Sequence, residues 1–317
     1  MDRRTGKTLQ ITQFEAARKK RLAVSTVIIL IMIPAILVAT VFTVSNGWYL
    51  PLSLLVLALV MAPFFMVFER RRPKAREVVL IAMMCALTVV IHMFFHIILP
   101  VQVGTAMVII AGISLGPEAG FLIGALSRFV VNFFMGQGMW TPWQMFCWGL
   151  LGFLAGLAFN LNEEDHLKST TFKVIMGPLL AVVFAEILAY VSYLIVPGND
   201  PGFPFWRLYV FGAFGLLAGV LLQRKRLPAD GLSLALFTFF TTFIIYGGLM
   251  NCAAMVTGAI YPGSDGISLS ALRAVYISGA PYDLLHASTA ALSVFLLGEP
   301  MIKKLERVKI KYGIYKR

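Results

Sequence analysis

Ionisable side chains within long apolar segments are the residues of this sequence best able to do chemistry. Because a charge is costly inside a lipid-facing segment, each such residue is a candidate for a substrate contact or for a pairing within the protein. The ionisable group comprises His92, His96, Arg128, Glu186, Asp283 and His286. Side-chain amides that could bind a neutral ligand occur at Asn132, Gln137, Gln144 and Asn251.

Two pairs of these residues have spacings that place both members on one helix face. His92 and His96 have the i, i+4 spacing of a metal-ligating pair, but no Glu follows His92 and no third ligand is evident. Asp283 and His286 are at i and i+3, which is weak evidence for an acid–base dyad and better evidence for mutual hydrogen bonding or substrate contact. We therefore predict no catalytic residue, no metal site and no bound cofactor.

Arg128 lies part-way along an apolar segment, where it needs a carboxylate, a backbone carbonyl or a water path. Glu186 and Glu118 are the candidate carboxylate partners. Nothing in the sequence places Arg128 at a pocket, so we expect a structural pairing with one of these residues in preference to a substrate role.

The stretch NFFMGQGMWTPWQ, residues 132–144, concentrates amides and indoles beside a glycine-containing turn. Indole faces stack on flat surfaces and amides both donate and accept hydrogen bonds, which suits an uncharged, polyfunctional ligand. The predicted substrate contacts are Asn132, Gln137, Trp140, Trp143 and Gln144, with Asn251 and Asp283 as less direct candidates. An aromatic belt at the membrane surface would explain the two tryptophans equally well.

The elements that must position these side chains are membrane-spanning helices. Hydrophobic residues make up 59% of the chain, charged residues 13%, and the mean hydropathy is +0.83. Uncharged runs such as Leu22–Val44 and Leu50–Phe68 are longer than barrel strands and exceed the roughly 18 residues that a helical span needs. The first run is expected to be an anchor, since no small-residue cleavage site follows it. We predict an all-α polytopic bundle.

About ten spans are expected, with boundaries uncertain by a few residues. They are 22–44, 49–68, 78–99, 102–116, 118–135, 143–159, 174–196, 206–222, 232–250 and 275–296. The fourth and fifth are short for a bilayer crossing, so we expect them to be tilted or shielded by neighbouring helices. The polar, glycine-rich segment 251–274 is predicted to be an external loop that folds over a pocket as a lid.

The net charge of +12 is explained by orientation in a membrane, and no nucleic-acid partner is predicted. Basic clusters at 18–21, 70–72, 224–226 and 303–304 alternate with connections poor in Lys and Arg. Under the positive-inside rule this pattern predicts cytoplasmic termini. Gly6-Lys7-Thr8 is similar to the end of a phosphate-binding loop, but Met1 stands where the first glycine of the loop would be, so the energy for any active transport must come from another protein.

An internal similarity relates two of the expected helices. The stretch WQMFCWGLLGFLAGL, beginning at Trp143, aligns without gaps to WRLYVFGAFGLLAGV, beginning at Trp206. The shared tryptophan, glycines and alanine indicate duplication of a helix pair, although two glycine-rich apolar helices can also resemble each other by chance. The glycines of both stretches allow close helix approach.

Four stretches of the sequence resemble the substrate-specific (S) components of energy-coupling factor (ECF) transporters. They are Ala82-x-x-x-Ala86, LGPEAGFLIGALS at 115–127, GQGMWTPWQMFCWGLLGFLAG at 136–156, and the last helix with its basic tail at 279–313. The resemblance implies a subunit that binds a vitamin outside the cell, topples in the membrane, and docks on a coupling protein driven by two ATPases. Ala82 and Ala86 would face that coupling protein.

The resemblance also implies a domain organisation built on a six-helix core. Residues 1–76 would be a basic tail and an extra hairpin, 77–160 the first four core helices, 161–231 an inserted helix pair, 232–299 the last two core helices with the long external loop, and 300–317 a basic cytoplasmic tail.

The expected function is the substrate-binding subunit of a vitamin importer in the cell membrane, with cobalamin as the first candidate ligand. The alternatives are a membrane-embedded enzyme acting on a lipid or isoprenoid and a stand-alone secondary transporter.

Overall fold

The structure, a computed structural model, describes residues 22–43, 75–98, 101–159, 171–195, 205–223, 227–259 and 266–312, together with Pro51, Leu55, Leu59 and Phe203. In these ranges the regular elements are helices. In chain order they are η1 (a π-helical turn, Ile28–Met32), α2 (Ile33–Thr43), α4 (Ala75–Ile98), α5 (Val103–Leu115), α6 (Pro117–Met135), α7 (Thr141–Ala158), α9 (Thr171–Ile195), α10 (Arg207–Leu222), α11 (Gly231–Phe240), η3 (π-helical, Thr241–Gly247), α12 (Gly248–Gly258) and α13 (Leu269–Lys311). The all-α prediction is confirmed.

Five helices of the described chain are long and apolar enough to cross a membrane. They are Ala75–His96, Pro117–Met135, Ile175–Ile195, Gly231–Gly258 and Leu269–Lys311. Shorter apolar helices cover Leu22–Leu37, Val103–Leu115 and Arg207–Leu222. The polytopic character is therefore confirmed, while the expected number of about ten full-length spans is not reached. The expected span at 49–68 lies almost wholly outside the described residues.

Helix α5 is the centre of the bundle. All 13 of its residues are buried, which agrees with the expectation that this short helix is shielded by its neighbours. The backbones of α5, α6 and α7 meet at glycines: a Cβ on Gly120 would lie 2.5 Å from Cα of Gly112 and 2.6 Å from the carbonyl oxygen of Gly152. No side chain fits there, so the three helices can pack at this distance only with glycine.

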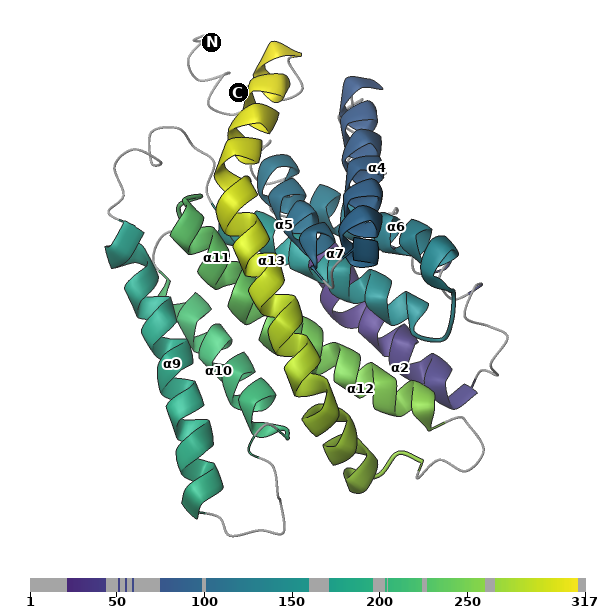
Figure 1. The fold of residues 1–317 in the computed structure, drawn as a ribbon, viewed down its shortest axis with the longest axis vertical. Helices are drawn as coiled ribbons and strands as arrows, with labels where there is room; N and C mark the ends of the chain where they lie inside the picture. Colours follow the sequence, from purple (N-terminus) through teal and green to yellow (C-terminus); the bar gives the residue numbers. More distant parts are fainter. Residues whose placement is uncertain are drawn as a thin grey trace, which may run out of the picture.

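Helices α9 and α10 form a separate pair at one edge of the bundle, as Figure 1 shows in green. Helix α9 packs mainly on α10, and α10 packs on the π-helical segment η3. The pair begins where the insertion was predicted, between α7 and α11. Its exposed side chains include Phe184, Phe214 and Leu221, so its outer face is suited to lipid.

The predicted external loop at 251–274 is wrong. Helical structure runs without a break from Gly231 to Gly258 and resumes at Leu269, so the connection between helices is limited to residues 259–268. The polar residue that argued against a helix, Asn251, hydrogen-bonds a buried carboxyl group and therefore costs little inside the bundle. A lid of the predicted length does not exist.

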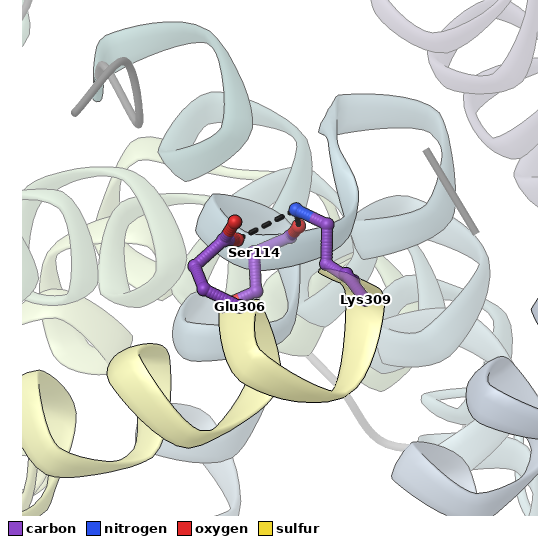
Figure 2. Close-up of polar contacts among 3 residues, drawn as sticks. All are labelled: Ser114, Glu306 and Lys309. Carbon is purple, nitrogen blue, oxygen red and sulfur yellow. Dashed lines mark hydrogen bonds and ion pairs between the residues drawn. The ribbon is translucent and has the colours of Figure 1, made fainter. Parts of the chain in front are cut away.

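Helix α13 also extends through the segment 300–311 that we expected to be a tail. It crosses the molecule obliquely (Figure 1), and its C-terminal turns reach the end of α5. Figure 2 shows the contact: Nζ of Lys309 donates to the carbonyl oxygen of Ser114 at 2.6 Å and pairs with Glu306 at 2.6 Å. The final carbonyls of a helix lack intrahelical donors, so this ammonium group stabilises the end of α5.

Candidate functional site

A cavity of about 200 Å³ lies where α4, α6, α7 and the residue before α5 meet η3, α12 and α13. Its lining is mostly polar, in contrast to the rest of the bundle. The lining residues are His96, Gln102, Arg128, Met135, Gln144, Tyr246, Met250, Asn251, Gly279, Tyr282 and Asp283. Such a set of converging polar groups in a membrane bundle marks a candidate substrate site.

Hydrogen-bond donors dominate the wall formed by α6 and α7. Nε of Arg128 donates to Oε1 of Gln144 at 3.0 Å, and Nδ2 of Asn132 donates to the same oxygen at 2.8 Å. The guanidinium group also lies 5.1 Å from the ring centroid of Trp148 and 3.4 Å from Nε2 of His92. These contacts hold the cation at the cavity wall, and no carboxylate of the described chain pairs with it.

A single acidic side chain, Asp283, dominates the opposite wall. Its Oδ2 accepts a hydrogen bond from the hydroxyl of Tyr209 at 2.7 Å and another from Nδ2 of Asn251 at 2.7 Å. No donor in the described chain pairs with Oδ1, and the residue lines the cavity. Arg128 and Asp283 therefore present a donor and an acceptor to the same space without bonding each other.

The floor of the site is fixed by aromatic and hydroxyl groups. Nε2 of His286 and the hydroxyl of Thr105 are 2.8 Å apart, and Nε1 of Trp148 donates to the same hydroxyl at 3.1 Å. The ring of Tyr246 packs edge-on against His286 at a centroid distance of 4.6 Å. Thr105 thus joins α5 to both α7 and α13 beside the cavity, while Nδ1 of His286 is buried without a hydrogen-bond partner in the described chain.

Three predicted contacts line the cavity: Gln144, Asn251 and Asp283. A fourth, Asn132, is buried directly behind Gln144 and orients its amide. Sequence position alone had suggested these residues because amides and acids are costly in apolar helices unless they face a polar space.

The remaining three predicted contacts do not line the cavity in this structure. Gln137 donates to the carbonyl oxygen of Phe129, Trp143 is buried within the hydrophobic core, and Trp140 is 42% exposed. Gln137 and Trp140 precede α7 and Trp143 lies in its first turn, so closeness in sequence to Gln144 does not bring these side chains to the cavity.

Sequence reasoning underestimated Arg128. Its predicted pairing with Glu186 or Glu118 is wrong, since its guanidinium contacts Gln144, His92 and Trp148 instead. Glu118 lies ten residues earlier on the same helix, about 15 Å away along the axis, and Glu186 lies against Gly212 in the α9–α10 pair. No acidic residue stands at i±3 or i±4 from Arg128, so no carboxylate in the neighbouring turns of its own helix could pair with it.

The other lining residues were less clearly indicated by the sequence. Gln102, Tyr246 and Tyr282 lie at ordinary positions in apolar segments, and only their tertiary placement brings them together. His96 was a candidate and does line the cavity. Asp283 and His286, expected to bond each other or a substrate, do not bond each other: Asp283 bonds Tyr209, and His286 bonds Thr105.

A larger groove of about 590 Å³ lies between α7, α9, α10 and α11. It is lined almost entirely by aliphatic and aromatic side chains such as Leu157, Val182, Leu216 and Phe237. A polar molecule would find few partners for its donors and acceptors there, and burying them unpaired is costly. The smaller, polar cavity is therefore the candidate site.

Comparison with known proteins shows what the chain is similar to. The sequence profile of a family described as ECF-type riboflavin transporter, S component, matches residues 73–204. Residues 73–204 are therefore similar in sequence to an S component. A UPF0397 protein of Phytoplasma australiense is 29% identical over 136 residues, which are 41% of this chain and 68% of that protein. No solved structure matches the chain.

The S-component match divides the candidate site. Arg128 and Gln144 lie inside the matched residues 73–204, whereas Tyr209, Asn251 and Asp283 follow them in sequence. The family is one of membrane transporter subunits and not of enzymes, so the lipid-modifying enzyme considered from the sequence is set aside. The donor wall thus belongs to the matched region, and the acceptor wall lies beyond it.

Proposed function

We propose that this protein is the substrate-binding subunit of an ECF importer and that it captures a vitamin-like molecule in the 200 Å³ cavity. The main observation behind this proposal is that hydrogen-bond donors line one side of the cavity and an acceptor lines the other. Arg128 and Gln144 offer donors on one side, and Asp283 offers an acceptor on the other.

The free groups of the cavity define the chemistry of the substrate. Nη2 of Arg128 and Nε2 of Gln144 have no acceptor in the described chain, so they can donate to carbonyl oxygens or ring nitrogens. Oδ1 of Asp283 can accept from an N–H or O–H group. A planar heterocycle with carbonyls and an N–H on its edge satisfies both walls. The isoalloxazine ring of riboflavin, the compound in the matching family's description, has that edge.

Cobalamin, the first candidate from the sequence, is not supported. The family match is of riboflavin type, and the cavity of about 200 Å³ is below the range of roughly 300–1,000 Å³ that encloses drug-sized ligands. A corrin is far too large for it. A volume of this size accommodates the polar edge of a ring system while the rest of the ligand extends outward.

The partners we propose are a membrane coupling protein and its two ATPase subunits, with both termini of this chain on the cytoplasmic side. Ala82 and Ala86 support the coupling part of the proposal. Both are exposed on α4, on the same face as Val79 and Val90. Small side chains at i and i+4 expose a flat surface on which another helix can pack closely.

The deciding experiment is mass spectrometry of small molecules released from gently purified full-length protein, followed by titration of the emptied protein with riboflavin. Recovery of a flavin or another heterocycle of this type, with binding that saturates at one site, supports the proposal. If the protein retains no such compound and riboflavin does not bind, the substrate assignment fails.

The coupling surface is tested separately by replacing Ala82 and Ala86 with Leu. The added bulk should weaken uptake by cells that contain the coupling protein and ATPases, while binding to the isolated subunit is unchanged. The controls are Met83→Ala and Leu87→Ala, which change side chains exposed on a neighbouring part of α4. Equal loss of binding and uptake in the alanine variants would show instead that the two alanines support the fold.

A further inference from the structure

The α9–α10 pair sends one buried hydroxyl group into the polar network of the candidate site. That hydroxyl belongs to Tyr209, near the start of α10, and it donates to Oδ2 of Asp283 on α13 at 2.7 Å. The tyrosine is 3% exposed, so the contact is made within the bundle and not at its surface. Tyr209 also lies outside the residues that match the S-component family.

Two neighbouring aromatic rings hold the ring of Tyr209 in place. It stacks on Phe243 at a centroid distance of 5.2 Å with 17° between the ring planes, and meets Tyr276 edge-on at 4.7 Å. Both neighbours belong to helices that also border the candidate site. A ring held on two sides has a fixed hydroxyl position, which makes the hydrogen bond to Asp283 directional.

The carboxyl group of Asp283 is confined in the same way. A Cβ on Gly247, the last residue of η3, would lie 2.6 Å from Cγ of Asp283, so the glycine provides the space that the carboxyl group occupies. Tyr209 and Asn251 both donate to Oδ2. With Oδ2 held by two donors, Oδ1 is the oxygen left to accept a hydrogen bond from a ligand in the cavity that Asp283 lines.

We infer that Tyr209 is a positioning residue for substrate recognition: through Oδ2 it orients Asp283 so that Oδ1 accepts a hydrogen bond from an N–H group of the ligand. The α9–α10 pair thereby forms part of the binding machinery. This inference rests on the proposed binding function. It extends that function by assigning ligand selectivity to a helix outside the matched domain.

Riboflavin and its N3-methyl derivative are the probes for the test, because they differ in the N–H group that Oδ1 would accept. Full-length protein is titrated with each, and the ratio of the two dissociation constants measures selectivity for the N–H group. Tyr209→Phe keeps the ring and its packing but removes the donor. We expect riboflavin binding to weaken by about tenfold, with much less change for the N3-methyl derivative.

Two matched variants separate positioning from general structural damage. Tyr190→Phe removes a hydroxyl from the half-exposed face of α9 and should leave the selectivity ratio unchanged. Tyr276→Phe removes a buried hydroxyl that donates to the carbonyl oxygen of Gly248 at 2.9 Å. It should lower thermal stability without changing selectivity. Tyr209→Phe added to Asp283→Asn should have no further effect on binding.

A second measurement is independent of any ligand. The infrared carboxyl band of Asp283, identified as the band lost in Asp283→Asn, should shift in Tyr209→Phe. It should shift in the opposite direction when 3-fluorotyrosine, a stronger donor of nearly the same size, replaces Tyr209. An unshifted band in both cases overturns the inference whether or not riboflavin binds. If the wild-type protein fails to bind riboflavin but the band shifts, the riboflavin assignment fails while the positioning role stands.

Discussion

The hairpins α6–α7 and α9–α10 share a packing pattern but differ in surroundings. In α7, Gly152 lies against Gly120 and Gly156 against Pro117 of the preceding helix. The aligned glycines of α10, Gly215 and Gly219, face Val182 and Pro178 of α9 in the same way. The span of α6 is 56% buried within the protein, whereas that of α9 is 17% buried.

This difference shows what a glycine stripe determines and what it does not. In both places the stripe brings two helices together, as the internal sequence similarity led us to expect. Only α6–α7 combines that packing with a charged donor wall, Arg128 and Gln144. The pair α9–α10 contributes its hydroxyl group, Tyr209, from outside the stripe. The helix contact is therefore combined with the candidate site in different ways: in α6–α7 the polar residues bond each other across the pair, and in α9–α10 the hydroxyl group bonds a residue of α13.

The largest expected effect concerns how closely the helices pack in the two hairpins. In Gly156→Ala the new Cβ would lie 2.5 Å from the backbone nitrogen of Pro117, and the backbone cannot yield easily. We expect a loss of about 2–3 kcal/mol in the free energy of unfolding. At the aligned Gly219 the nearest atoms are 3.2 Å away. There the cost should be offset by the helix propensity of alanine, about 1 kcal/mol.

Reversible unfolding of both glycine variants in the same detergent measures this contrast. The wild-type protein sets the reference, and ligand-free samples remove any contribution from binding. Equal destabilisation of the two variants would contradict the view that α9–α10 packs less tightly than α6–α7.

The next effect compares the ionisable residues of the two hairpins. Arg128→Gln removes the cation that faces the cavity, and we expect riboflavin affinity to fall by at least about tenfold, or ~1.4 kcal/mol. Glu186→Gln changes a side chain that packs against Gly212 and does not line the cavity, so affinity should stay within about threefold. Calorimetric titration of both purified variants with riboflavin measures the two affinities. A larger effect at Glu186 would move the site toward α9.

A smaller effect concerns the amide that links the donor wall. Gln144→Ala removes a cavity-lining donor and also the oxygen that accepts from Arg128 and Asn132. Leaving a ligand oxygen and two protein donors unpaired should weaken binding several-fold, by about 1–2 kcal/mol. Gln137→Ala is the matched control, because its amide donates to the Phe129 carbonyl and does not line the cavity. The same titration should show no loss in the control.

The smallest expected effect separates the pocket from the aromatic belt, the choice that the sequence left open. Trp140 is 42% exposed and does not line the cavity, so Trp140→Ala should leave affinity unchanged. Trp143 is a core residue, and Trp143→Ala should lower thermal stability by the cost of a buried large-to-small change. Affinity measured on folded protein decides this. A clear loss of binding in Trp140→Ala would restore the original assignment of this residue to the pocket.

The sequence by itself determined that this protein lies in lipid and that it forms helices. Long uncharged runs indicate helices in lipid, since a helix pairs its backbone hydrogen-bonding groups within one segment and these runs are too long for barrel strands. The glycine spacing predicted close helix pairs, and the cost of polar groups in apolar segments indicated Asp283, Asn251 and Gln144 as candidates, all of which line the cavity. These conclusions depend on local composition and spacing, which are readable along the chain.

The tertiary structure alone decided which residues meet. Each residue turns a helix by about 100°, so whether a side chain faces a cavity or lipid depends on the rotation of its helix, which distant contacts set. Trp143 turned into the core and Arg128 toward the cavity for this reason. Tyr209 reaches Asp283 across a sequence separation of 74 residues because α10 packs on η3. No local pattern encodes that contact.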